Sequence, residues 1–240
     1  MKLLFLLTFL FFSFTPREDF LSQQKKYERV RQAYKEKETV ITERLAKENI
    51  ALNELSILIA AFKEEKEFEV YAKRKNETEY RKISTYKICA LSGLLGPKRR
   101  IGDGQVPEGF YYINRYNPVS SYYLSLGINY PNASDRKKSK AAKPGGDIFI
   151  HGECVTIGCL PMTNDKIKEI YLYAIHAHAN GQQIPVYIFP FRMSEANMSS
   201  HKSSPETSAF WNNLKSGYDK FQSGMKEFNV SVNKAGDYVF

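Results

Sequence analysis

The chain has 240 residues, of which 42% are hydrophobic and 14% aromatic, and a formal net charge of +9. A chain of this length buries one ordinary core, so we expect one main domain with added helical segments. The basic charge suits nucleic acid, an anionic cell wall or a membrane surface. No zinc-finger spacing, RNA-binding signature or glycine-rich phosphate loop is visible, and we therefore predict no nucleic-acid partner.

Residues 1–15 are interpreted as a secretory signal peptide. Met1 and Lys2 precede an apolar run, residues 3–14, that is too short to span a bilayer. The small-residue cleavage signature is poor, so the cut site stays open, and the alternative is an uncleaved segment at the membrane interface. Only in that alternative would the protein associate peripherally with a membrane. No cysteine follows the run, which argues against a lipoprotein anchor. We expect export to the periplasm or cell envelope.

Residues 16–63 are predicted to form a helical N-terminal segment. No glycine or proline occurs between Arg17 and Ser92, and apolar residues recur at spacings of three, four or seven from Tyr27 to Phe62. This stripe predicts one long helix that packs on the catalytic domain or self-associates.

Residues 64–195 are predicted to form the catalytic domain. Alternating apolar and polar residues on both sides of the polar turn at 75–78 predict a hairpin. Further strands are expected near residues 110–114, 122–126 and 184–189. Residues 135–146 are rich in Lys and Arg, and we expect a mobile basic loop that holds substrate carboxylates, although a solvated run of charge explains the pattern equally well.

The segment from Asp147 to Thr163 carries the candidate site. An apolar run, residues 148–150, predicts a short buried strand that ends at His151, and Gly152 then allows a sharp turn. If the chain from His151 to Cys159 were extended, their Cα atoms would lie roughly 26 Å apart. The chain must therefore double back if the two side chains are to meet, and we expect a tight loop or hairpin that brings Cys159 towards His151.

A thiol beside an imidazole predicts acyl transfer, with Cys159 as the nucleophile and His151 as its base. A helix is predicted to begin after Thr163 and to end at Gly181, and the partial positive charge at its N-terminus favours a thiolate. The backbone N–H groups of Gly158 and Cys159 are expected to be free to form an oxyanion hole.

The other two cysteines leave alternatives open. Three cysteines in an exported protein leave one unpaired. A buried inert thiol is the default for Cys89, and a disulfide between Cys89 and Cys154 is the alternative. Cys154 is given no catalytic role.

A zinc site is the weaker alternative to the thiol site. It would combine His151, Cys154 and Cys159 with either His176 or His178. His178 lies on the apolar face of the predicted helix, whereas His176 is expected to be exposed. We predict no metal and no cofactor.

Residues 196–240 are predicted to form a C-terminal extension. A linker rich in Ser, Asn and Lys precedes apolar residues at helical spacing from Phe210 to Phe228. Residues 230–240 then predict a short hairpin, and the extension is expected to cover the sheet or a groove.

The pattern His-Gly-x-x-x-Thr-x-Gly-Cys, from His151 to Cys159, resembles the signature of the YkuD-type L,D-transpeptidases, in the compact form of the YafK-like branch. The likeness extends over residues 84–192. It includes the segments 89–93, 102–109, 125–131 and 184–190. The resemblance implies an α+β fold whose catalytic domain is mainly β, with a long N-terminal helix and a C-terminal helical extension.

The resemblance also implies an envelope enzyme that acts on peptidoglycan. Such enzymes take an acyl group from a stem peptide, hold it as a cysteine thioester and pass it to an amine. Cys159 falls on the family nucleophile and His151 on the family base, with Gly152 where its carbonyl can orient the imidazole. Partners would be stem peptides and, for this branch, also wall-linked proteins. We predict that the substrate contacts Tyr130, Ser134 and Arg136.

The sequence also departs from the family pattern. Many members have a second histidine before Gly-Cys, where this chain has Ile157, and the interval between the two halves of the motif is shorter. Some YafK-like proteins hydrolyse envelope linkages, so transfer to an amine and hydrolysis both stay open. A non-catalytic wall-binding protein is the alternative from another class.

Overall fold

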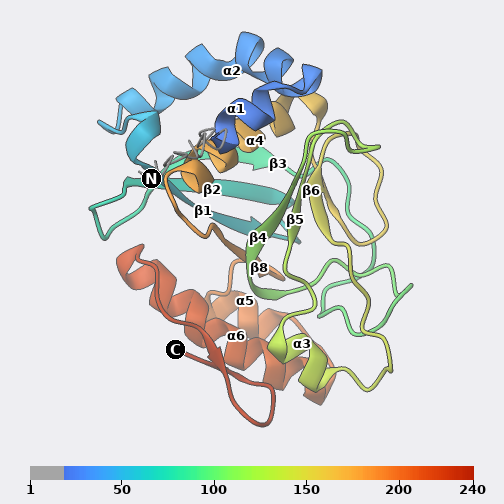
Figure 1. Ribbon diagram of the computed structural model, residues 1–240. Helices are drawn as coiled ribbons and strands as arrows, with labels where there is room; N and C mark the ends of the chain where they lie inside the picture. Colours follow the sequence, from blue (N-terminus) through green and yellow to red (C-terminus); the bar gives the residue numbers. More distant parts are fainter. Residues whose placement is uncertain (1–18) are drawn as a thin grey trace, which may run out of the picture.

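The computed structural model describes residues 19–240, and the predicted signal peptide lies outside this range. The described residues form a mixed β-sheet with helices on both faces (Figure 1). Among them, no helix has the length and apolar character needed to cross a bilayer. The predicted α+β fold class is confirmed.

Within the described residues, two helices come first, five strands follow them, and helices and strands are interspersed after β5. The strands are β1 Leu55–Phe62, β2 Glu67–Arg74, β3 Arg81–Lys87, β4 Gly109–Asn117, β5 Ser125–Ile128, β6 Phe149–His151, β7 Leu160–Pro161, β8 Pro185–Phe189, β9 Ser231–Val232 and β10 Tyr238–Val239. The helices are α1 Phe20–Lys25, α2 Glu28–Ala46, α3 Ala133–Lys138, α4 Asn164–Ala179, α5 Glu195–Ser200 and α6 Pro205–Gly224, with a 3₁₀ turn η1 at Leu52–Glu54.

Eight of the strands form one sheet, in the order β3-β2-β1-β8-β4-β5-β6-β7. The pairs β1–β8 and β6–β7 are parallel, and all the other neighbours are antiparallel. Strand β1 lies inside the sheet, where Leu55 pairs with Arg74 of β2 and Ile59 with Val186 of β8. The candidate site lies at the edge of the sheet formed by β6 and β7, which are the last two strands in this order.

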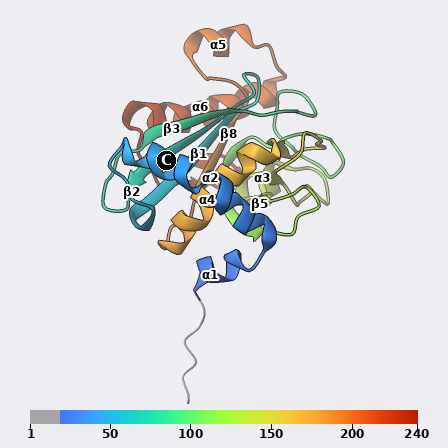
Figure 2. The same cartoon turned by 90° about the horizontal axis from the view of Figure 1, so that it is seen from above.

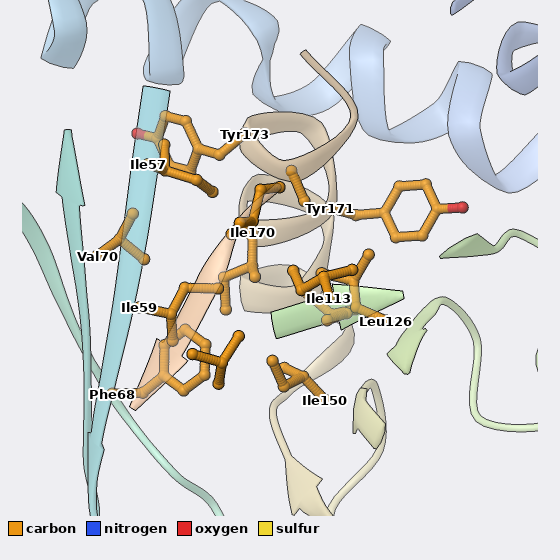
Figure 3. Packing of buried hydrophobic residues seen from close by; sticks show 14 of the residues in the cluster. Ile57, Ile59, Phe68, Val70, Ile113, Leu126, Ile150, Ile170, Tyr171 and Tyr173 are labelled. Carbon is orange, nitrogen blue, oxygen red and sulfur yellow. The ribbon is translucent and has the colours of Figure 1, made fainter. Parts of the chain in front are cut away.

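The two faces of β1 enter two different cores. Ile57 and Ile59 pack in the cluster shared with α2 and α4, which Figure 3 shows from close by. Leu58 and Phe62 face the cluster shared with α6 and the C-terminal hairpin. All eight residues of β1 are buried. A strand that is covered on both faces has a continuous apolar sequence and no polar alternation.

The prediction of a helix as far as Phe62 was wrong, because helix α2 ends at Ala46 and residues 55–62 form strand β1. A short continuous apolar run has the same appearance in a buried helix and in a buried strand, so its periodicity does not separate them. The predicted domain boundary between residues 63 and 64 falls in the turn that joins β1 to β2, two strands that pair along their whole length.

The N-terminal helices pack on α4. Of the two predicted alternatives, packing on the main domain and self-association, the structure shows the first. In the view from above, α2 lies beside α4 (Figure 2). Arg44 of α2 donates a 2.7 Å hydrogen bond to the carboxylate of Glu169 on α4, and the same nitrogen donates to the hydroxyl of Tyr173 at 3.0 Å. These contacts join the N-terminal helix to the face of the sheet that lies under α4.

The C-terminal extension covers the second face of the sheet. Helix α6 begins after the cap residue Ser204 with Pro205 in its first turn, which confirms the predicted helix. Trp211 of α6 donates a 2.8 Å hydrogen bond from Nε1 to Glu108, whose other carboxylate oxygen accepts from Nζ of the buried Lys63 at 2.8 Å. The extension is therefore anchored to the loop that precedes β4.

The predicted mobile basic loop is partly a helix. Residues 133–138 form α3, because Asn132 and Asp135 cap each other's backbone N–H groups in a capping box. The sequence reading missed this signal, since the run of Lys and Arg that follows concealed the helix start.

Candidate active site

The nucleophile and its base come from neighbouring strands. In the parallel pair, Ile150 of β6 lies opposite Leu160 of β7 and His151 lies opposite Pro161. Cys159, just before β7, therefore sits beside Phe149, whose N–H donates to the thiol sulfur at 3.4 Å. The chain doubles back as predicted, but the hairpin alternative was wrong, since the loop at 152–159 returns the chain in a parallel direction.

Cys159 and His151 line one cleft of about 510 Å³. Val155 and Ile157, from the loop between β6 and β7, contribute to its wall, and so do Ser120 and Tyr122 from the turn between β4 and β5. Ile157 is 84% exposed and Tyr122 45% exposed, so the rim of the cleft is apolar and open to solvent. Both predicted catalytic side chains therefore border the same cleft.

A backbone carbonyl holds the imidazole of His151. Nδ1 of His151 lies 2.5 Å from the carbonyl oxygen of Gly152, and because a carbonyl can only accept, Nδ1 carries the proton. Nε2 is then left with a lone pair and can take a proton. Burial lowers the pKa of His151, and the hydrogen bond to Gly152 only partly opposes this effect. The imidazole is neutral at pH 7.

Burial also raises the pKa of the Cys159 thiol, and the N–H of Phe149 only partly counters it. The resting site therefore holds a neutral thiol near a neutral imidazole. The raised pKa does not support the prediction that the N-terminus of α4 favours a thiolate at Cys159, since burial is the largest cause of the shift. Helix α4 itself begins as predicted, with the side chain of Thr163 capping its first turn.

The two backbone N–H groups predicted for the oxyanion hole are occupied in this structure. The N–H of Gly158 donates to Oγ of Ser92 at 2.7 Å, and the N–H of Cys159 donates to Oγ1 of Thr156 at 2.9 Å. The prediction that both groups are free was wrong, because two hydroxyls beside the nucleophile accept from them. For Thr156 the spacing of three residues to Cys159 is a local signal for such a side-chain to backbone bond.

Tyr122 is a third cleft residue that sequence reasoning missed. The centroid of its ring lies 4.7 Å from that of His151, at an interplanar angle of 35°. Gly152 is crowded by the same turn, since a Cβ there would lie 2.8 Å from the carbonyl oxygen of Tyr122 and 2.5 Å from Oδ1 of Asn164. Only glycine fits between these neighbours, which explains the His-Gly pair.

Comparison with known proteins identifies the family of this chain. The model of the L,D-transpeptidase catalytic domain, YkuD, matches residues 57–188, which is more than half of the chain. The chain belongs to the L,D-transpeptidase family.

Individual relatives were also found. The chain is 44% identical over 186 residues to YafK of Escherichia coli K12, which its name assigns provisionally to the L,D-transpeptidases, and the match covers 76% of this chain and 73% of that protein. Among solved structures, the helical cell shape determining protein Pgp2 of Campylobacter jejuni gives a TM-score of 0.46 at 18% identity, covering 81% of this chain and 80% of that one. Bd1075 of Bdellovibrio bacteriovorus gives a TM-score of 0.41 at 21% identity, covering 70% of this chain and 57% of that one.

A disulfide joins the loop that carries the nucleophile to the segment after β3. Cys89 and Cys154 are bonded, with their Cα atoms 5.5 Å apart, and Cys159 is the free cysteine. The default of an inert Cys89 thiol was wrong, because the N–H of Cys89 bonds to the carbonyl of Pro161 at 3.1 Å and so holds this segment against the end of β7. In this member of the L,D-transpeptidase family, the alternative pairing is the one observed.

The disulfide predicts a thiol count and a stability difference. Unfolded, unreduced protein should react with iodoacetamide at one thiol, and reduced protein at three. Replacement of both Cys89 and Cys154 by serine should lower the free energy of unfolding in urea by about 2–4 kcal/mol, because the bridge restricts the unfolded chain. Three reactive thiols before reduction would contradict the pairing.

The remaining histidines do not support the zinc alternative. Cys154 is committed to the disulfide, and residues 19–240 contain no group of three or more His, Cys, Asp or Glu side chains placed to hold a metal ion. The two helix histidines are also reversed from expectation. His176 is half-buried at 3.0 Å from the hydroxyl of Tyr34, and burial lowers its pKa to about 4, whereas His178 is exposed beside the ring of Phe20.

Two of the three predicted substrate contacts are buried outside the cleft. The hydroxyl of Ser134 is fully buried and donates to the carbonyl of Gly236 at 2.6 Å, and Tyr130 donates to the carbonyl of Pro144 at 2.9 Å. Neither hydroxyl lies in the cleft, because both serve the packing of α3 and its neighbouring loop. Arg136 is exposed and lines a separate surface cavity with Lys143, so it is not brought together with Cys159.

The raised thiol pKa predicts how Cys159 reacts with a small electrophile. The thiolate is the reactive form, so alkylation of Cys159 by iodoacetamide should be slow at pH 7 and should rise with a midpoint above the ordinary thiol range. Mass spectrometry of the folded protein measures this rate, and the unfolded protein, with a midpoint of about 8.5, is the control. A midpoint below pH 7 would indicate a thiolate paired with an imidazolium and would refute the neutral pair.

Proposed function

We propose that the protein is a cysteine-dependent L,D-transpeptidase that acts on peptidoglycan stem peptides. The observation that carries the proposal is the pairing, in one cleft, of the free thiol of Cys159 with the buried imidazole of His151, whose Nδ1 is held by the carbonyl of Gly152. Membership in the L,D-transpeptidase family supports peptidoglycan as the substrate class. The same membership supports a place in the periplasm or cell envelope.

The first half of the reaction forms a thioester. Nε2 of His151 takes the proton from the thiol as the sulfur of Cys159 attacks the carbonyl carbon of the stem peptide, and a sulfur–carbon bond forms. The imidazolium then gives that proton to the departing amine as the carbon–nitrogen bond breaks. Because burial lowers the pKa of His151 and raises the pKa of Cys159, transfer of the proton is unfavourable until a substrate carbonyl is in place.

The second half reverses these steps with an acceptor amine. The acceptor attacks the thioester carbonyl, His151 takes a proton from its nitrogen, and the thiol of Cys159 is regenerated. The N–H groups of Gly158 and Cys159 would stabilise the oxyanion once the hydroxyls of Ser92 and Thr156 release them. Water in place of the amine would make the same site a hydrolase.

Mass spectrometry of intact protein and of products tests this proposal. Purified protein is incubated with tetrapeptide muropeptides and, separately, with protein-linked muropeptides, beside the Cys159→Ala variant. New cross-links or exchange of the terminal residue, absent from the variant, would support a transpeptidase. Release of linked protein or peptide with water incorporated would identify a hydrolase. If neither a product nor an acyl adduct forms, the protein is interpreted as a non-catalytic wall-binding protein.

A further inference from the structure

The N-terminal helix α2 reaches the wall of the cleft through one side chain. Nη1 of Arg29 donates to the carbonyl oxygens of Ser120 and Tyr123, at 2.5 Å and 2.6 Å. Both carbonyls belong to the β4–β5 turn, residues 118–124, which connects the two strands and lines the cleft. Arg29 therefore bonds to two positions in one turn, although it lies more than 90 residues before that turn in the sequence.

The β4–β5 turn has a backbone that needs such support. Tyr123 has a φ of 71°, in the left-handed region that bulky residues rarely adopt. The guanidinium of Arg29 also lies over the ring of Tyr123 at 5.4 Å, and the hydroxyl of Tyr123 donates to Gln32 of α2 at 2.9 Å. Helix α2 thus holds both the backbone and the side chain of the turn at this residue.

The β4–β5 turn also contacts His151, the proposed catalytic base, and the residue that follows it. The carbonyl of Leu124 accepts from the N–H of Gly152 at 3.1 Å, and the carbonyl of Gly152 is the group that orients His151. The adjacent Tyr122 places its ring against the imidazole. A chain of direct contacts therefore runs from Arg29 through the turn to His151.

We propose that Arg29 is a positioning residue for the reaction, which fixes the β4–β5 turn and through it the orientation and burial of His151. Arg29 lies outside the matched L,D-transpeptidase domain, residues 57–188, so part of the active-site scaffold comes from the preceding helix. The inference rests on the proposed function for its effect on rate, whereas the effect on His151 is independent of any substrate.

The test compares Arg29→Ala with Arg31→Ala. Arg31 lies on the same helix and, within residues 19–240, donates to the carbonyls of residues 25 and 26 and to no group of the cleft, so it controls for a general effect on α2. NMR titration of the His151 imidazole gives its pKa, and mass spectrometry gives the rate at which a carbapenem-type β-lactam, a strained acyl donor, acylates Cys159. Thermal unfolding shows that each variant is folded.

Arg29→Ala should slow acylation roughly 10- to 100-fold, the scale of a misplaced catalytic group, and should move the pKa of His151 up towards its ordinary value as the turn loosens. Arg29→Lys should recover part of both effects, and it replaces Arg29→Ala if the alanine variant does not fold. Arg31→Ala should leave both unchanged.

Unchanged rate and titration in Arg29→Ala, or equal losses in Arg29→Ala and Arg31→Ala, would overturn the inference. If the pKa of His151 shifts in Arg29→Ala but no acyl donor modifies the protein, the positioning role of Arg29 is supported and the proposed function is contradicted. The two proposals can therefore fail separately.

Discussion

Replacement of Cys159 by alanine should abolish turnover of muropeptides and formation of any acyl adduct. The thiol is the atom that would form the thioester, and the two remaining cysteines are tied in a disulfide and cannot replace it. The loss should be complete within the sensitivity of product mass spectrometry. Alanine removes one atom from a partly exposed side chain, so circular dichroism and thermal unfolding should remain close to those of the native protein.

The matched control for this prediction uses the other thiols. A carbapenem-type β-lactam should label the native protein at Cys159 and should not label Cys159→Ala. The double serine variant of Cys89 and Cys154 should still be labelled at Cys159. Full activity of Cys159→Ala, or labelling at Cys154 or Cys89, would exclude Cys159 as the nucleophile.

Replacement of His151 by glutamine should lower the rate of Cys159 acylation by roughly two to four orders of magnitude, the range expected for a positioned general base. Glutamine still offers an N–H to the carbonyl of Gly152, but it cannot take the proton of the thiol. The remaining rate should follow the concentration of free thiolate and should therefore keep rising above pH 9. The native rate should instead stay level down to mildly acidic pH, because the pKa of His151 is lowered and the imidazole remains unprotonated there.

His201→Gln is the control for the histidine prediction. His201 lies after α5, where it pairs with Glu64 and stacks on Phe191, and it does not line the cleft. Its variant should acylate at the native rate. An unchanged rate in His151→Gln would show that another group takes the proton.

The sequence was most informative where the signal was local. His151, Gly152, Gly158 and Cys159 lie within nine residues, so the return of the chain that brings both His151 and Cys159 to one cleft could be predicted from this segment alone. Helix α4 was also predicted, because its N-cap Thr163 and the following apolar spacing are contiguous signals.

Features that depend on residues far apart in the chain could not be predicted from the sequence. Strand β1 has an apolar sequence without polar alternation because both its faces are covered, and it therefore resembled a helix. The helix that covers its second face, α6, begins only at residue 205, so the sequence near β1 gives no sign of it. The pairing of Cys89 with Cys154 spans 65 residues, and two other pairings were equally allowed by composition. The occupied N–H of Gly158 depends on Ser92, and the support of the cleft wall depends on Arg29, neither of which has a local pattern that marks its role.

The position of β1 has a consequence for how the polypeptide acquires its structure during synthesis. Strand β2 follows β1 directly and can pair with it early, but β8, the neighbour on the other edge, arrives only at Pro185–Phe189. Until then a nascent chain presents a long apolar edge with unsatisfied backbone groups, which is the surface that recruits other strands. Ribosomes paused in this interval, or products truncated before Pro185, should therefore yield aggregates and not a smaller working enzyme.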